Sequence, residues 1–149
     1  MRMFDRRIFR EAGRTAALNL RSEAAGLTGT EIIDREQDAP DFDPTKDYSS
    51  WPVGAPVADE FQVWTLIQPH NAAHYPGGRP ATLRALWALA HTKDPTKAKP
   101  WVDPYGTSGM YMQDECYVDS NRAVFRSKRD NVVFPASVQP DDWEAVVWE

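Results

Sequence analysis

Twelve prolines interrupt this chain of 149 residues, and they constrain its fold more than any other feature. Proline lacks a backbone donor and clashes inside a helix, so a bundle of long helices would be broken repeatedly. The chain also carries six Trp, five Tyr and six Phe. In a small module that cannot bury much aliphatic surface, a few large rings supply the core. Prolines and rings together favour short β-modules.

The N-terminal part of the chain has a different pattern. Residues 6–26 are predicted to form one helix, because apolar residues recur there at steps of three and four. The stripe is made by Phe9, Ala12, Ala16, Leu20, Ala24 and Leu27. Thr28 and Glu31 have the spacing of a capping box, which predicts a second short helix. An isolated helix is marginally stable, so the stripe is expected to pack on the modules, on copies of itself or on a partner.

Charge is spread unevenly along this region. Residues 1–30 carry six arginines against three carboxylates, whereas residues 31–47 carry seven carboxylates against one Arg and one Lys. One interpretation is two differently charged solvated surfaces. The other is a basic helix that docks on an acidic partner surface.

The predicted fold class is mainly β, or α+β overall: two small antiparallel β-modules in tandem behind an N-terminal α-helix. The expected parts are a helical anchor (1–35), a linker (36–49), the first β-module (50–90), a second linker (91–100) and the second β-module (101–149). Prolines and charged residues mark both linkers. Alternating rings and β-branched residues predict a hairpin that turns at Asp59 and Glu60, and another that turns at Ser120 and Asn121.

The two modules match as an internal repeat. Trp51 aligns with Tyr111, Trp64 with Phe125, Tyr75-Pro76 with Phe134-Pro135, and Trp87 with Trp143. The order of these anchors is kept although the loops between them differ in length, which indicates two copies of one β-unit. Trp64, Trp87, Phe125 and Trp143 fall in strand patterns and are expected in the core.

The order of aromatic anchors resembles the chitin-binding-type modules that accompany chitinases and cellulases. Closer still is the resemblance to phage and prophage tail-fibre or virion proteins that carry an N-terminal helix and a tandem pair of such modules. The run Trp101-Val102-Asp103-Pro104-Tyr105-Gly106 is similar to the one that opens their second module. The resemblance implies a virion protein, made in the host cytoplasm and carried outside in the particle. Chitin-binding members place two adjacent exposed rings after the second hairpin strand, where this chain has Pro69-His70 and Arg129-Asp130.

Sugar binding therefore needs other rings. A flat aromatic face meets the apolar face of a pyranose, and neighbouring polar groups meet its hydroxyls. Loop positions next to the predicted strands supply both kinds of side chain. The predicted glycan face consists of Tyr75, Tyr105, Tyr111, Asp130, Asn131 and Phe134.

Other chemistries find little support in the sequence. A net charge of −5 argues against a nucleic-acid partner. No apolar run reaches the length of a signal peptide or a membrane span. His70 and His74 lack a third ligand, so no metal or cofactor is expected, and Cys116 is expected to be a buried thiol. No catalytic motif is present, and an enzyme is not expected.

These observations predict a non-catalytic virion protein of the tail, fibre, baseplate or head surface. It would assemble with other virion proteins through its helix, in several copies, and display its modules toward glycan of the bacterial surface. The alternative is an architectural adaptor whose modules bind other virion proteins and no sugar.

Overall fold

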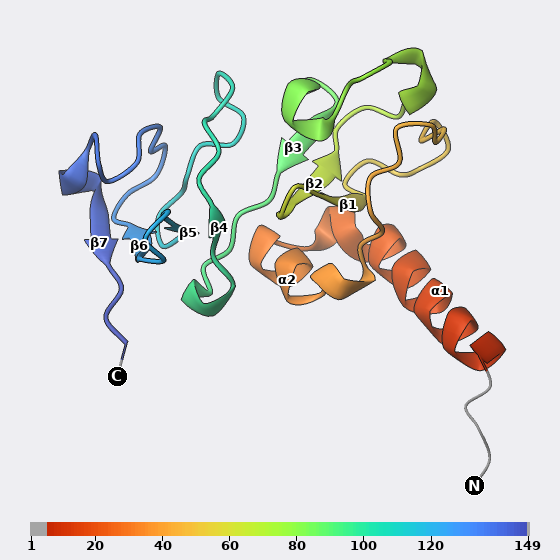
Figure 1. Cartoon of the computed structure of the whole chain (residues 1–149), viewed down its shortest axis with the longest axis horizontal. Coiled ribbons are helices and arrows are strands. Elements are labelled where there is room, and N and C mark those ends of the chain that lie inside the picture. The colour runs from red at the N-terminus through yellow and green to blue at the C-terminus, as the bar shows by residue number, and fades with distance from the viewer. Residues whose placement is uncertain (1–5, 149) are drawn as a thin grey trace, which may run out of the picture.

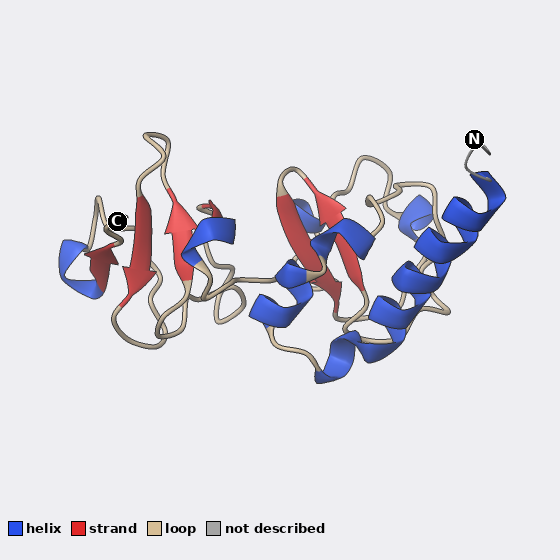
Figure 2. Cartoon of the chain, turned by 90° about the horizontal axis from the view of Figure 1, so that it is seen from below, coloured by secondary structure: helices blue, strands red, loops and turns tan. Residues whose placement is uncertain are grey.

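The computed structural model describes residues 6–148, with side chains from Ala12 onward. Two small β-sheets lie side by side along the long axis of the molecule, and the N-terminal helices lie beside the first sheet (Figure 1, Figure 2). The chain is therefore a small α+β protein with two separate sheets, as the proline and ring content predicted.

The N-terminal segment is helical. Helix α1 (Arg6–Glu23) continues into a 3₁₀ turn (Ala24–Gly26), and α2 (Gly29–Asp34) is followed by a second 3₁₀ turn (Glu36–Asp38). The predicted capping box is confirmed, because the Glu31 N–H donates to Thr28 Oγ1 and the Thr28 N–H donates to Glu31 Oε1. No helix within residues 6–148 is both long and apolar enough to cross a membrane.

The first sheet has the order β1-β2-β3 and is antiparallel throughout. Its strands are β1 (Pro56–Asp59), β2 (Gln62–Leu66) and β3 (Trp87–Leu89). The hairpin turns through Glu60 and Phe61, which have φ of 50° and 66°. Two positive φ angles match the twist of a two-residue hairpin, and most proteins meet this need with Asn or Gly.

The second sheet has the order β4-β5-β6-β7. Its strands are β4 (Lys99–Pro100), β5 (Cys116–Val118), β6 (Val124–Ser127) and β7 (Trp143–Ala145). Strand β4 runs parallel to β5, so the expectation of a purely antiparallel module is wrong at this edge. Short 3₁₀ turns complete the chain at Ala72–His74, Pro80–Thr82, Pro95–Lys97 and Pro140–Asp142.

Each module is organised around the same three-ring cluster. In the first, Phe42 stacks on Tyr48 at 5.9 Å and Tyr48 meets Trp87 edge to face at 5.2 Å. In the second, Trp101 stacks on Tyr111 at 4.8 Å, and Tyr111 meets Trp143 at 5.4 Å and 71°. Tyr48, and not Trp51, is therefore the partner of Tyr111 in the repeat. The sequence alignment paired Trp51 with Tyr111 at an offset of sixty residues. The loops that follow Phe42 and Trp101 differ in length, so the true pair, Tyr48 and Tyr111, has a different offset.

Both predicted linkers are wrong. Residues 36–49 contribute Phe42 and Tyr48 to the first core, and Asp41 pairs with Ala58 beside β1. Residues 91–100 contribute β4, and Thr92 pairs with Cys116. Two rings place the first segment in the core, whereas backbone pairing with β5 and Cys116 places the second, so prolines and charges alone do not indicate a free linker.

The predicted helical stripe is divided between two environments. Leu20 and Ala24 are buried, and the Arg21 guanidinium lies 3.8 Å above the Trp51 ring. Burial lowers the pKa of Arg21. Ala12 is exposed, Ala16 and Leu27 are half-buried, and the side chain of Phe9 lies outside the described residues. Among the side chains described, the fully buried ones of this stripe are therefore Leu20 and Ala24, at the C-terminal end of α1 and in the turn that follows it.

Candidate binding site

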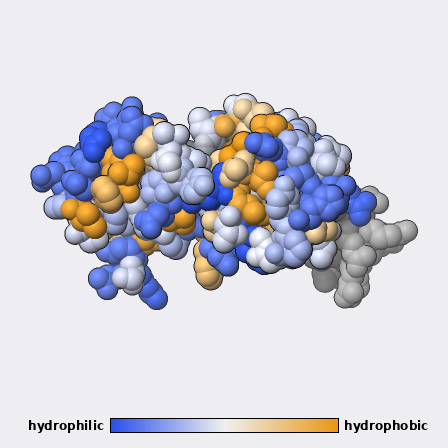
Figure 3. All heavy atoms as spheres, turned by 90° about the horizontal axis from the view of Figure 1, so that it is seen from above, coloured by the Kyte–Doolittle hydropathy of each residue, from blue (hydrophilic) through white to orange (hydrophobic). Residues whose placement is uncertain are grey.

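An aromatic groove of about 870 Å³ crosses the second module. Four rings line it. One follows β4 directly and the others lie in β5, β6 and β7: Trp101, Tyr117, Phe125 and Trp143. The hydropathy surface in Figure 3 shows hydrophobic residues gathered in separate patches over the two modules, with hydrophilic surface around them.

The strands hold these rings in fixed positions. Tyr117 and Phe125 are direct cross-strand partners, and their rings stack at 5.5 Å. Trp143 Nε1 donates to the Phe134 carbonyl, and Tyr117 Oη accepts from the Ala136 N–H at 2.9 Å. Burial raises the pKa of Tyr117, so this phenol is neutral at physiological pH. Main-chain pairing and these two hydrogen bonds therefore define the positions of the rings.

The polar rim comes from the second hairpin turn. Asp119 accepts the backbone N–H groups of Asn121 and Ala123, both at 2.8 Å, which fixes the turn. Ser120, Asn121 and Ser137 are exposed and line the groove. Hydroxyl and amide groups therefore lie next to ring surface, the combination that carbohydrate recognition requires.

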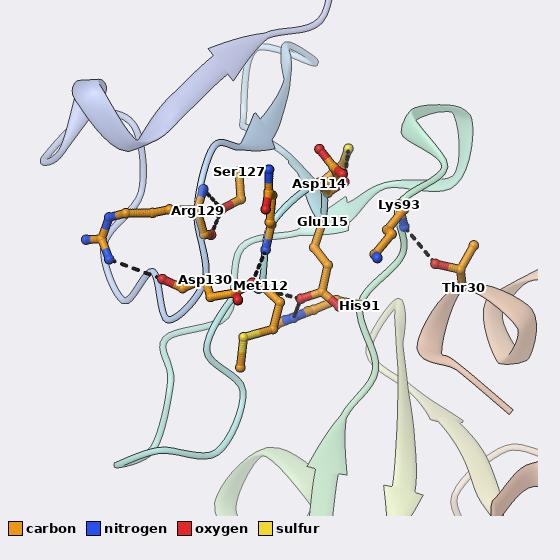
Figure 4. A network of polar contacts seen from close by, with 11 residues as sticks. Thr30, His91, Lys93, Met112, Asp114, Glu115, Ser127, Arg129 and Asp130 are labelled. Carbon is orange, nitrogen blue, oxygen red and sulfur yellow. Dashed lines mark hydrogen bonds and ion pairs between the residues drawn. The ribbon is translucent and has the colours of Figure 1, made fainter. Parts of the chain in front are cut away.

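Trp101 is the last ring of a stack of three, formed with Tyr111 and His91. The His91 ring lies 3.7 Å from Tyr111 and nearly parallel to it, and Tyr111 is in turn parallel to Trp101. Glu115 holds the stack in place, because its Oε1 lies 3.2 Å from His91 Nδ1 and accepts the Met112 N–H at 2.7 Å (Figure 4). The stack joins the end of the first sheet to the groove of the second.

The corresponding position in the first module is lined by charged side chains as well as by rings. A cavity of about 600 Å³ lies beneath the first hairpin, where Ala58 to Phe61 occupy the positions of Val118 to Asn121. Its lining includes the ion pairs Glu36–Lys99 and Asp59–Arg79. The repeat thus carries one aromatic groove and one ionic cavity at equivalent sites.

The predicted glycan face is distributed over several places. Tyr75 and Tyr105 line one cavity of about 360 Å³ together with Leu83 and Arg84, away from the groove. Tyr111 was wrongly expected near the surface, because it is 1% exposed and forms the middle of the ring stack. Burial raises its pKa.

The other predicted residues lie in the loop between β6 and β7. Phe134 is exposed and supplies the carbonyl that accepts from Trp143. Asp130 accepts the Gln113 N–H at 2.9 Å, and Asn131 takes a positive φ of 61° in the turn. Asp130 and Asn131 therefore have structural roles that explain their residue types.

The groove residues could be assigned from sequence only as core. Trp143 and Tyr117 are buried, while Trp101 and Phe125 are half-buried, so these rings belong to the core and line the groove together. Trp64 and Trp87 are buried as predicted. The sequence signal that could have indicated the groove is the cross-strand pairing of Tyr117 with Phe125. Neighbouring rings on one face of a short sheet interact with each other, and other side chains cannot cover all of them.

His70 and Cys116, which were considered as a metal ligand and a reactive thiol, are packed in the protein interior. His70 is buried against Tyr48 and Trp87, and Cys116 is a buried thiol in β5 whose pKa is raised by burial. Among the described residues, no three His, Cys, Asp or Glu side chains converge as a metal site would require. Arg129 Nε and Nη2 donate to the two carboxylate oxygens of Asp142 at 2.8 and 2.9 Å. Arg129 stands where chitin-binding modules are expected to carry an exposed ring, so this position forms an ion pair instead.

No protein-family model matches the chain, and no curated protein matches it either.

Proposed function

We propose that this chain is a non-catalytic bacteriophage virion protein that binds glycan of the bacterial surface in the groove of its second module. The observation that carries the proposal is the set of four rings beside the exposed Ser120 and Asn121. The C–H face of a pyranose packs on such rings, and the polar rim hydrogen-bonds to its hydroxyls. A single groove of this kind binds weakly, so many copies on one particle supply the avidity.

The presence of a single carboxylate among the described residues that line the groove favours binding over hydrolysis. Glycosidases use two carboxyl groups on either side of the scissile bond. Asp119 is the one carboxylate among the described residues that line the groove, and it is committed to backbone N–H groups.

The virion assignment rests on the resemblance of the run that opens the second module and on the N-terminal helix. Helix α1 is the proposed contact with other virion proteins, because residues 12–15, Leu18 and Asn19 on it are exposed. A protein made in the host cytoplasm and released by lysis in a particle reaches surface glycan without secretion.

Sedimentation with insoluble chitin and with purified peptidoglycan tests glycan binding. The wild-type protein is expected to sediment with at least one polymer, and Trp101→Leu to lose this binding. Trp148→Leu is the matched control, because Trp148 is exposed outside the groove. Near-UV circular dichroism of each variant shows whether the module remains folded. A folded Trp101→Leu protein that binds as well as wild type would contradict the proposal.

The second candidate is an architectural adaptor that binds protein and no sugar. Phe61 favours it, because this ring is 86% exposed at a hairpin tip. Exposed aromatic side chains are enriched at protein interfaces. Co-assembly with tail or head proteins, combined with no sedimentation on any polymer, would select the adaptor.

A further inference from the structure

Arg84, in the loop before β3, is a buried cation with two unused nitrogen donors. It is 9% exposed, and its Nη1 donates to the Asp103 carbonyl at 3.0 Å. Its Nε and Nη2 are buried and have no hydrogen-bond partner among the described residues. A buried donor without a partner costs free energy, and more so when the group is charged. The acceptor that would satisfy these donors best is an anion.

Nε and Nη2 together form one edge of the guanidinium, and this edge binds carboxylates elsewhere in the chain. Arg79 donates through these two atoms to both carboxylate oxygens of Asp59. Arg129 donates in the same way to Asp142. The planar edge matches two oxygens of a carboxylate or of a phosphate. Arg84 therefore offers an anion the same edge that two other arginines offer to their aspartates.

The surroundings of Arg84 hold its guanidinium in place. The Cζ atom lies 5.2 Å from the centre of the Trp64 ring, whose face attracts a cation. Gly109 has a φ of 82°, and a Cβ at this position would lie 2.6 Å from Arg84 Nη2. The missing side chain thus lets the backbone come close to the guanidinium. A side chain that is already ordered loses little conformational entropy when it binds a ligand.

The cavity of about 360 Å³ that Arg84 lines has a positive character. Arg84 is the single charged side chain among the described residues that line it. The others are neutral: Tyr75, Ala81, Thr82, Leu83, Ala85, Leu86 and Tyr105. The chain as a whole carries a net charge of −5, so this lining is an exception to the overall charge. A lining with one cation and no carboxylate selects anions.

Two exposed tyrosine rings complete the cavity. Tyr75 is 41% exposed in a loop of the first module, and Tyr105 is 65% exposed in a loop of the second. Tyr105 exchanges two backbone hydrogen bonds with Ser108, at 2.9 and 3.0 Å, which fixes its loop. An aromatic face packs on the C–H face of a pyranose, and a phenol hydroxyl can hydrogen-bond to the hydroxyls of the sugar. Rings and guanidinium together therefore match a sugar with a negative charge.

We propose that this cavity binds a sugar that carries a carboxylate or a phosphate group, with the anionic group on Arg84 and the sugar ring on the two tyrosines. The inference goes beyond the proposed function, because the cavity shares no lining residue with the aromatic groove. Ligand pockets range from about 300 to 1,000 Å³, so a cavity of this size suits a single sugar unit.

NMR titration of the full chain with glucuronate, glucose 6-phosphate and glucose tests the proposal. We expect at least one anionic sugar to shift the amide signals of residues 81–86 and Tyr105 in a saturable way. That sugar is expected to bind at least about tenfold more tightly than glucose, because hydrogen bonds to a charged group are the stronger ones. The tighter of the two anionic sugars identifies the anionic group.

Two variants test the two parts of the site. Arg84→Met is expected to reduce the affinity for the anionic sugar to that for glucose. Tyr105→Ala, which leaves the contact of Arg84 with the Asp103 carbonyl in place, is expected to weaken binding about threefold or more. Lys128→Met and Phe134→Ala, exposed outside the cavity, are the matched controls. Amide signals far from the substitution show whether each variant remains folded.

Equal affinity for glucose and for both anionic sugars would overturn the inference, as would unchanged affinity in a folded Arg84→Met or Tyr105→Ala protein. Trp101→Leu separates this result from the proposed function. If that variant loses polymer binding and keeps the anionic sugar, the groove and the cavity are two independent sites and both proposals stand. If the wild-type protein sediments with a polymer and no sugar shifts the cavity signals, only this inference fails.

Discussion

The ion pair between Arg129 and Asp142 closes the loop before the last strand. Two hydrogen bonds join the side chains, and Trp143 follows directly in the sequence. The Arg129 bonds hold the pKa of Asp142 below its ordinary value. The pair therefore stabilises the fold at pH values above the unfolded pKa of about 3.9. This stabilisation is lost as the pH falls through the lower folded pKa.

Asp142→Asn is expected to lower the melting temperature at neutral pH, and the difference from wild type is expected to shrink in strongly acidic buffer. Thermal unfolding followed by circular dichroism from neutral to acidic pH measures this. Asp141→Asn is the control, because Asp141 is exposed and forms no ion pair within residues 6–148. An equal difference at both ends of the pH range would show that the pair does not act through Asp142 ionisation.

At the residue scale, the burial of the strand Trp residues and the exposure of Tyr75, Tyr105 and Phe134 could be predicted, and the burial of Tyr111 could not. Trp64, Trp87 and Trp143 lie in strand patterns and are buried. Tyr111 lies beside a loop in the sequence, yet His91 and Trp101 cover both sides of it. Those covering rings come from ten and twenty residues away, which no local pattern reveals.

At the element scale, local sequence patterns predicted the helices and the two hairpins. The stripe from Phe9 to Leu27 predicts one helix over residues 6–26, where the structure has α1 followed by a 3₁₀ turn. The spacing of Thr28 and Glu31 predicts the start of α2. Alternating rings predict both hairpins. The pairing of β4 with β5 was missed, because a two-residue parallel strand has no sequence period. The position of β4 depends on contacts on either side of it: Thr92 pairs with Cys116, and the Trp101 ring packs on Tyr117.

Thr28→Ala is expected to destabilise the protein by about 1 kcal/mol, the usual effect of losing an N-cap side chain. Helix α2 carries Ile32 and Ile33 into the core with Val63, so the loss reaches the first sheet. Urea denaturation measures the change. Thr28→Ser keeps the hydroxyl and is expected to retain most of the stability. If both variants unfold alike, the capping bond contributes nothing measurable.

At the scale of the whole molecule, the two modules are tied together by polar contacts. Arg84 Nη1 donates to the Asp103 carbonyl at 3.0 Å, and its guanidinium lies 5.2 Å from the Trp64 ring. Gln62 Nε2 donates to the Pro100 carbonyl. Arg84 is buried without a carboxylate partner in the described chain, and burial lowers its pKa. We therefore expect Arg84 to contribute to the orientation of the modules more than to the free energy of unfolding.

Arg84→Met is expected to change the free energy of unfolding by less than about 1 kcal/mol, because replacing a buried charge by an apolar chain of similar length is often neutral. It is also expected to loosen the junction, so that residues 101–110 are cleaved faster in limited proteolysis. Lys128→Met, exposed in the second module, is the control. Unchanged cleavage in a folded Arg84→Met protein would show that Arg84 does not set the module orientation.

The segment between the sheets has a further consequence because it is not a free tether. Lys93 N–H donates to Thr30 Oγ1, Lys97 pairs with Asp34, and Lys99 pairs with Glu36, so both ends of the segment are fixed. The cavity of the first module and the groove of the second are thereby held at a constant separation, and we propose that this spacing acts as a ruler if both of them bind. A repeating polymer or assembly whose period matches that separation engages both surfaces at once, whereas a mismatched one engages a single surface. Selectivity can then arise from spacing even where each surface alone discriminates poorly.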